Sequence, residues 1–214
     1  AGTLGGMLAH KLAERERVRV VRLIDPVSTV ASGKALDIRQ AGPLEQFDTQ
    51  VIATKEIEAV STATAIVVTG PADTPDEDWY GEAALKLLEQ VANLTLRTPI
   101  ICAGASQGPL VANGVRRLGI NPKRIFGSAP WAFLSSLKAL VALEARVSPS
   151  EVALNLLGVP PAHSVITWSS ATISGCPLED TLSPPQLTRL RNQGELLWPP
   201  GPYALASAAT RIVE

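Results

Sequence analysis

The first 120 residues alternate short apolar runs with longer amphipathic ones, and this alternation strongly constrains the fold. Four runs rich in Val and Ile predict strands: VRVVRLID (18–25), QVIAT (50–54), TAIVVTG (64–70) and PIICAG (99–104). Continuous apolar runs of this length are typical of strands buried on both faces. Helical patterns lie between them, at 4–16, 29–40, 78–94 and 108–119. Strand followed by helix, repeated, predicts right-handed crossovers and an α/β fold with a doubly wound parallel sheet.

The pattern changes after about Pro130, where we place a boundary between a first domain, 1–130, and a second, 131–214. The second part begins with a long apolar helix, predicted over 131–145, and a strand follows over 151–159. Prolines then break the chain into short pieces, because proline ends helices and cannot donate to a sheet. Two further helices are predicted, over 183–197 and 203–214.

Composition excludes several classes of protein. Hydrophobic residues make up 46% and charged residues 18%, so the chain can bury a core and is not intrinsically disordered. The net charge of -1 disfavours nucleic acid or an acidic membrane as the main partner. No apolar run approaches a membrane span, and the first 20 residues do not resemble a secretory signal. Two cysteines, Cys102 and Cys176, do not make a disulfide scaffold or a metal site, so we expect a cytoplasmic protein without a metal.

Both ends of the sequence look cut. The chain opens inside a glycine-rich turn with no strand before it, and it closes in a helical pattern, RIVE, that has no stop signal. We therefore expect the natural protein to carry further terminal segments. An intact mass clearly above 22.5 kDa would support that expectation.

The glycine turn AGTLGG (1–6) opens a helix, and Asp25 ends the next strand at the spacing expected of a dinucleotide fold. Gly2 and Gly5 would let the backbone approach a pyrophosphate at the positive end of the helix. Asp25 would accept hydrogen bonds from the adenosine ribose and repel a 2′-phosphate, which favours NAD over NADP. Two alternatives stay open: the glycines serve turn geometry only, and Asp25 caps a helix or ends a strand in solvent.

Nearly the whole chain resembles the lactate/malate dehydrogenase family. The matching segments are AGTLGGMLAHKLA, LIDPVSTVASGKALDIRQAG, TAIVVTGPA, RIFGSA, ARVSPSEVALNLLG, WSSATISGCPL and GPYALASAATRIVE. The family fold is a Rossmann-type domain followed by an α+β substrate domain. The resemblance implies that the strand before the glycine turn and the C-terminal part of the substrate domain lie outside this sequence. Members usually form homodimers or homotetramers, so we expect the same here.

The resemblance also implies which residues hold the cofactor. By this match, the pyrophosphate is lined by Gly2, Thr3, Leu4 and Gly5. Asp25 would bind the adenosine ribose. The nicotinamide half would lie over Gly70 and Pro71.

The substrate side departs from the family pattern. The family protonates the product alkoxide with a His that an Asp orients, and holds the substrate with Arg residues. Here Pro160 stands at the His position, Phe133 at the Asp position and Ser136 at the Arg position. Ala105 and Ser106 replace an Asn-Pro pair. The loop after Pro71 should bring another Arg, but it contains the acidic residues Asp73, Asp76, Glu77 and Asp78. Since each lost group typically contributes about 10²-fold or more, the ordinary malate or lactate reaction is not expected.

Two interpretations follow. In the first, the protein is an NAD-linked oxidoreductase of the family with an altered substrate or weak activity. The proton would then be moved by His163, by Tyr80 or by a residue outside this sequence, and Lys138 could offer a cation. For His163 and Lys138 the alternative is a surface or structural role. In the second interpretation, the protein is a non-catalytic relative that serves as a nucleotide-binding or assembly scaffold.

Overall fold

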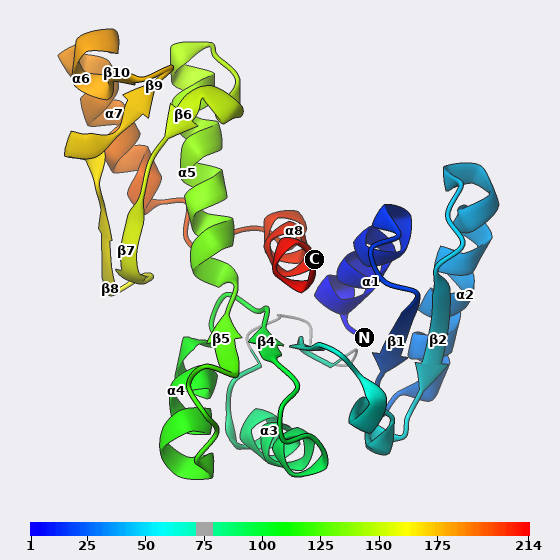
Figure 1. Ribbon diagram of the computed structural model, residues 1–214. Helices are drawn as coiled ribbons and strands as arrows, with labels where there is room; N and C mark the ends of the chain where they lie inside the picture. The colour runs from blue at the N-terminus through cyan, green and yellow to red at the C-terminus, as the bar shows by residue number, and fades with distance from the viewer. Residues whose placement is uncertain (72–78) are drawn as a thin grey trace. The chain divides into compact units, whose positions relative to one another are not determined.

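In the computed structural model, which describes residues 1–71 and 79–214, the backbone divides into two units (Figure 1). The first contains residues 1–129 and 201–214, and the second contains residues 130–200. The last helix, α8 (Pro202–Val213), therefore packs with the first unit, although the sequence boundary grouped it with the second. It lies along α1 (Thr3–Arg15), and Arg15 pairs with Glu214 at 3.1 Å.

The strands of the first unit are parallel, as predicted. β1 (Val20–Ile24) pairs with β2 (Gln50–Thr54) in the register Val20↔Gln50 to Ile24↔Thr54. A second ladder has the order β3-β4-β5, formed by β3 (Ile66–Val68), β4 (Ile100–Cys102) and β5 (Ile125–Gly127). The four predicted strands are confirmed. The sequence reading missed β5, which is only three residues long and ends two residues before the next helix.

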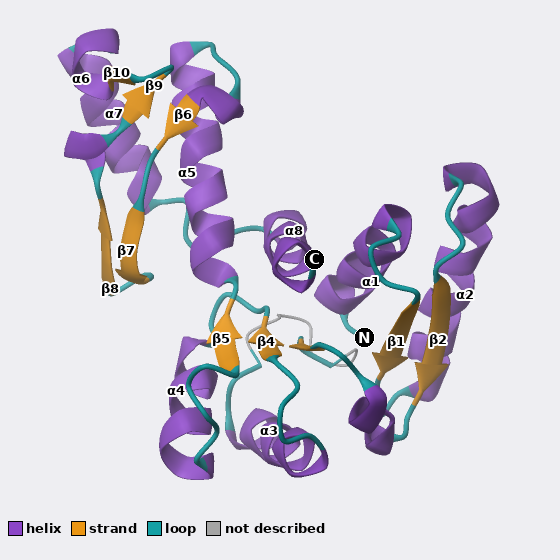
Figure 2. Cartoon of the chain, in the orientation of Figure 1, coloured by secondary structure: helices purple, strands orange, loops and turns teal. Residues whose placement is uncertain are grey.

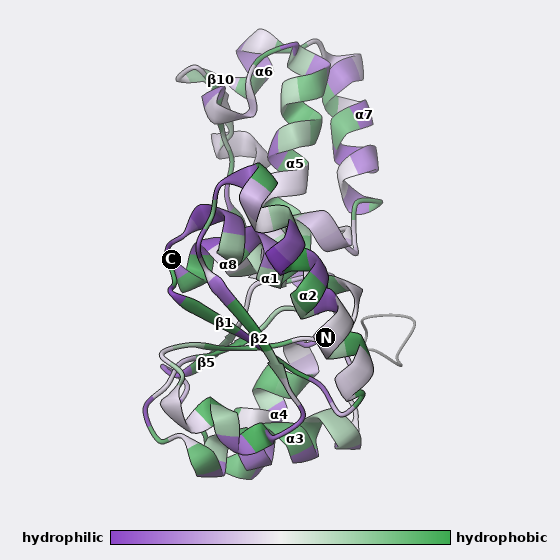
Figure 3. Ribbon diagram, turned by 90° about the vertical axis from the view of Figure 1, so that its right-hand side faces the viewer, coloured by the Kyte–Doolittle hydropathy of each residue, from purple (hydrophilic) through white to green (hydrophobic). Residues whose placement is uncertain are grey.

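Helices pack beside both ladders (Figure 2). Near β1 and β2 lie α1 and α2 (Ser28–Glu45), and a 3₁₀ helix, η1 (Ile57–Thr62), precedes β3. Beside the second ladder lie α3 (Glu82–Leu94) and α4 (Gly108–Leu118). Their apolar side chains form one core with the strands, made mainly of Leu85, Leu88, Val91, Leu110, Ile66, Ile100 and Ile125. Figure 3 shows green and purple alternating along α3 and α4, as expected for helices with one buried face.

Helix α2 runs further than predicted. The sequence indicated 29–40, but the helix continues through Pro43 to Glu45. Pro43 removes only one backbone donor there. The helix then ends at Gln46 in a left-handed conformation, φ 62°, with its N–H bonded to the carbonyl of Gly42 at 2.7 Å.

The second unit has mixed helix and antiparallel sheet. α5 (Ala129–Ala145) runs into it, and the predicted strand over 151–159 is two strands, β6 (Val152–Ala153) and β7 (Leu156–Val159). β7 forms a hairpin with β8 (His163–Ile166), and β6 joins β9 (Thr172–Ile173) and β10 (Cys176–Pro177). The remaining helices are α6 (Leu178–Thr181), α7 (Pro184–Glu195) and a turn, η3 (Trp168–Ser170); η2 (Pro149–Glu151) precedes β6. The core lies between α5, α7 and the strands.

Local sequence explains where these elements begin. Ser148 caps η2 in a capping box with Glu151, and Ser183 caps α7 in the same way with Gln186. Proline follows both caps at the first helical position, where a missing N–H costs no helical hydrogen bond. In the part of the chain that the structure describes, no helix is long and apolar enough to span a membrane.

Candidate functional site

The glycine turn packs tightly against the segment that follows β3. Gly2 is the N-cap of α1, and its N–H donates to the carbonyl of Gly70 at 3.3 Å. A Cβ atom on Gly2 would lie 3.0 Å from the carbonyl oxygens of both Gly70 and Pro71. One on Gly5 would lie 3.0 Å from the hydroxyl of Thr69. Side chains at Gly2 and Gly5 would therefore separate the turn from this segment, and the structure brings together the glycine-turn residues with Gly70 and Pro71.

Asp25 lies beside the same turn, immediately after β1. Its side chain is buried, with 1% of the residue exposed. One carboxylate oxygen accepts a hydrogen bond from the backbone N–H of Val27 at 2.8 Å, and the other pairs with the nitrogen of Ala1. The carboxyl ends of β1 and β3 thus meet at residues 1 and 2. In open α/β sheets this edge, between diverging crossovers, is where ligands bind.

Sequence reasoning missed Lys34, which completes this group of residues. From α2 it donates to the carbonyl oxygens of Ala1 and Gly2 at 2.6 Å each. A Cβ atom on Gly6 would lie 3.1 Å from its Cδ. The signal was present only as a lysine nine residues after Asp25, and no spacing rule predicts where so long a side chain ends.

The start of α1 is suited to an anion. The helix macrodipole places partial positive charge at its first turn. Among the described residues, no side chain forms a cap hydrogen bond there and no acidic residue occupies the first turn. Backbone N–H groups at such a position bind phosphate or carboxylate. Thr3, Leu4 and Gly5 form this first turn, so the arrangement fits a dinucleotide pyrophosphate.

The three residues that the resemblance places at the substrate positions lie in the second unit and have apolar or small side chains. Phe133 is 5% exposed and meets the ring of Trp198 edge-on, with the ring centroids 5.5 Å apart and the planes at 89°. The hydroxyl of Ser136 donates a hydrogen bond to the carbonyl of Ala132, one turn earlier in α5, at 3.2 Å. Pro160 is buried in the turn between β7 and β8. Phe133, Ser136 and Pro160 supply neither an ionisable group nor a cation.

His163 opens β8 and is exposed, opposite Val159 in the hairpin. Its carbonyl oxygen lies 2.0 Å from where a Cβ on Gly158 would stand, and Gly158 has φ +90°, so the hairpin requires glycine there. No hydrogen bond or ion pair of the His163 ring occurs within the described ranges. His163 belongs to the second unit and the glycine turn to the first, so its catalytic role stays a prediction.

The surroundings of the other candidate residues indicate structural roles or exposed positions. Nε2 of His10 lies 2.9 Å from a carboxylate oxygen of Glu45, a contact between α1 and α2. Cys102 is fully buried in β4, and burial raises the pKa of its thiol to about 12, so it is a small apolar core residue. Tyr80 is 47% exposed in the first unit. Asp73, Asp76, Glu77 and Asp78 lie outside the described residues. In the part of the chain that is described, no group of three His, Cys, Asp or Glu residues could hold a metal ion.

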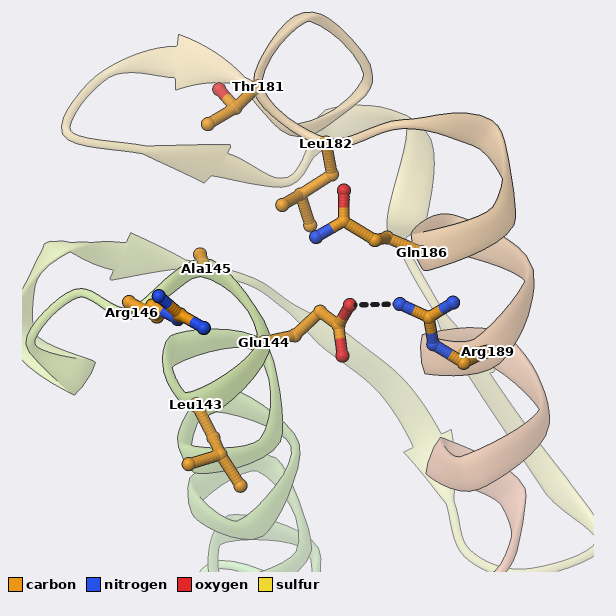
Figure 4. A pocket seen from close by; sticks show the side chains of 8 residues that line it. All are labelled: Leu143, Glu144, Ala145, Arg146, Thr181, Leu182, Gln186 and Arg189. Carbon is orange, nitrogen blue, oxygen red and sulfur yellow. Dashed lines mark hydrogen bonds and ion pairs between the residues drawn. The ribbon is translucent and has the colours of Figure 1, made fainter.

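A pocket of about 560 Å³ lies in the second unit, between the end of α5 and the start of α7 (Figure 4). It is lined by Leu143, Glu144, Ala145, Arg146, Thr181, Leu182, Gln186 and Arg189. Glu144 accepts a hydrogen bond from Arg189 at 2.6 Å, and this bond lowers the pKa of its carboxyl group. The pocket contains none of the predicted site residues. Of its three charged lining residues, Glu144 and Arg189 pair with each other, and Arg146 is the third.

Comparison with known proteins finds relatives by sequence and by structure, although no family model matches the chain. A curated malate dehydrogenase from Roseiflexus sp. (strain RS-1) is 29% identical over 225 residues, covering 98% of this chain and 72% of that protein. One from Thermomicrobium roseum is 28% identical over 229 residues, covering 100% and 74%.

Solved structures of the same kind share the fold. Malate dehydrogenase from Salinibacter ruber superimposes with a TM-score of 0.84 at 20% identity, covering 99% of this chain and 72% of that one. Malate dehydrogenase from Plasmodium falciparum, solved in complex with NADH, gives 0.83 at 20% identity, covering 100% and 74%. The sequence relatives and the shared fold, both of which extend over nearly the whole chain, support membership of the lactate/malate dehydrogenase family.

Proposed function

We propose that this protein binds NAD at the glycine turn and no longer carries out the ordinary reduction of a simple 2-oxo acid. The observation that carries the first half is the meeting of the start of α1 with buried Asp25 at the carboxyl ends of β1 and β3. The relative from Plasmodium falciparum, whose structure holds NADH, supports the same assignment.

Thr3, Leu4 and Gly5 would hold the pyrophosphate with their backbone, while Gly70 and Pro71 would pass beneath the nicotinamide half. Asp25 would accept hydrogen bonds from the adenosine ribose. When bound, the dinucleotide supplies a hydride donor or acceptor. A buried carboxylate at this position disfavours the 2′-phosphate of NADP, since two negative charges would meet in a poorly solvated site.

Phe133 carries the second half of the proposal. A carboxylate that orients an imidazole must itself be hydrogen-bonded or solvated, and this position is instead filled by a phenyl ring in an apolar core. With Pro160 and Ser136 at the other two positions, no acid-base group and no carboxylate clamp remain at the family sites. Either the protein oxidises or reduces a substrate that is not a simple 2-oxo acid, with His163 or Tyr80 moving the proton, or it acts as a nucleotide-binding or assembly scaffold.

Titration of the full chain with NADH, followed by its fluorescence and repeated with NADPH, tests the proposal. We expect saturable binding of NADH and much weaker binding of NADPH. The variant Asp25→Asn keeps the shape of the side chain but removes its charge, so it should reduce the ratio of the affinity for NADH to that for NADPH. Circular dichroism checks that the variant still folds. If the wild-type chain binds neither nucleotide, the proposal fails and the glycine turn is only a structural feature. A panel of hydroxy compounds and oxo acids, assayed at saturating cofactor, then separates an altered enzyme from a scaffold.

A further inference from the structure

We infer that Lys34 is a positioning residue for the proposed dinucleotide site, holding the glycine turn in the conformation that receives the pyrophosphate. This inference rests on the proposed binding of NAD. Its basis is the pair of 2.6 Å hydrogen bonds from the Lys34 ammonium to the carbonyl oxygens of Ala1 and Gly2. Hydrogen bonds from a charged donor are shorter and stronger than neutral ones.

The two bonds fix the direction of the peptide groups that follow. In a trans peptide the C=O and N–H bonds point in opposite directions. With the carbonyl of Ala1 held by Lys34, the N–H of Gly2 points the other way and donates to Gly70 at 3.3 Å. With the carbonyl of Gly2 held by both Lys34 and the N–H of Gly6, at 3.0 Å, the N–H of Thr3 points out of the helix start. That is the direction in which an anion lies at a helix N-terminus.

Gly6 makes this contact possible. The side chain of Lys34 crosses from α2 to the first turn of α1 directly over Gly6, where an added Cβ would lie 3.1 Å from Cδ and 3.4 Å from Nζ. Lys34 is partly buried, and its neighbours Ala31 and Ala35 on the same helix are buried. The ammonium therefore sits next to the turn in a partly desolvated place, where its charge also attracts phosphate.

Four single variants of the full chain, and the double variant Gly6→Ala with Lys34→Met, separate this role from a general effect on folding. Lys34→Met removes the charge and the donors at nearly constant volume. Lys34→Arg keeps both. Lys123→Met makes the same charge change at an exposed residue before the amino end of β5, which is the opposite end of that ladder from the glycine turn. Gly6→Ala crowds the Lys34 side chain and leaves the lysine present.

Two measurements are made on each variant: hydrogen exchange of the amides in residues 2–6 without cofactor, and the Kd for NADH at low and high salt. For Lys34→Met we expect the exchange rate of the amides in residues 2–6 to rise about tenfold. We expect the Kd for NADH to rise by about the same factor, which corresponds to ~1.4 kcal/mol of binding free energy. The salt dependence of binding should also fall, because one cation near the phosphates is gone. Lys34→Arg should restore most of the affinity, and Lys123→Met should behave as wild type. Gly6→Ala alone should weaken the binding of NADH. In the double variant with Lys34→Met it should have little further effect on the Kd, because the contact it disturbs is already absent.

The outcomes separate the two proposals. If the wild-type chain does not bind NADH, the proposed function is refuted, and this inference with it. If the wild type binds and Lys34→Met has the same Kd, the role of Lys34 is refuted while cofactor binding stands, whatever happens to the exchange. A loss in Lys34→Met that Lys34→Arg does not restore would also overturn it.

Discussion

Replacing Phe133 by Asp, the residue type that the resemblance implies for this position, should unfold the second unit. Phe133 is 5% exposed and packs edge-on against Trp198 at 5.5 Å. Truncating a buried Phe costs about 3–5 kcal/mol. A carboxylate in the same apolar place adds a desolvation penalty of several kcal/mol unless it takes up a proton. The sum is comparable to the whole stability of a domain, about 5–15 kcal/mol.

Urea unfolding followed by tryptophan fluorescence measures the loss in free energy of unfolding, because Trp198 packs against the ring that is replaced. Phe133→Leu is the matched control, and we expect it to cost less than about 1.5 kcal/mol. The pH dependence gives an independent check. Burial would raise the folded-state pKa of the new carboxyl above its unfolded value of about 3.9. Between these two values only the folded state holds the proton, so stability falls as the pH rises through that window. If Phe133→Asp stays within about 1 kcal/mol of Phe133→Leu at neutral pH, the apolar description of this site is wrong.

Two further predictions concern reactivity. Because burial raises the pKa of Cys102 to about 12 and Cys176 is exposed, a thiol reagent at pH 8 should label one cysteine quickly in the native protein and the second only after unfolding; two rapidly labelled thiols would contradict the burial of β4. Pro160→His alone should restore no malate turnover, because Phe133 and Ser136 still leave the new imidazole without its carboxylate and the substrate without its clamp. Measurable oxidation of malate with NAD by that variant would refute the proposal that the ordinary reaction of the family is absent.

Most of the fold could be read from the sequence because its strands are continuous Val/Ile runs with clear boundaries. The run at 50–54 is β2 to the residue. The misreadings have local causes. Around β5 only Ile125 and Phe126 are strongly apolar, too few to mark a strand, and the run at 151–159 predicted one strand because its apolar residues continue past the end of β6. Leu154 and Asn155 separate β6 from β7, and the carbonyl of Asn155 accepts the N–H of Thr167 at 3.0 Å.

The site was predictable to the extent that it depends on backbone. Gly2 and Asp25 are placed by a turn and a strand end, both of which have fixed spacing in sequence. Lys34 could not be found this way, because its ammonium reaches the turn through four flexible carbon–carbon bonds from another helix. The packing of Trp198 against Phe133 could not be predicted either, because a contact between residues 65 positions apart has no signature in a single sequence.

The glycines do not decide by themselves whether the cofactor is still bound. Gly2 and Gly5 are explained by their close approach to residues 69–71, so they would be needed even in a protein that binds nothing. Asp25 and Lys34 are different, because a buried carboxylate and a partly buried ammonium lose hydration on folding, and this loss often exceeds what their contacts return. An apolar residue at either position would pack at less cost, as Phe133 does on the substrate side. The charged pair Asp25 and Lys34 at the glycine turn, beside the apolar Phe133 in the second unit, is what favours the proposal of a protein that binds its nucleotide without the ordinary reaction of the family.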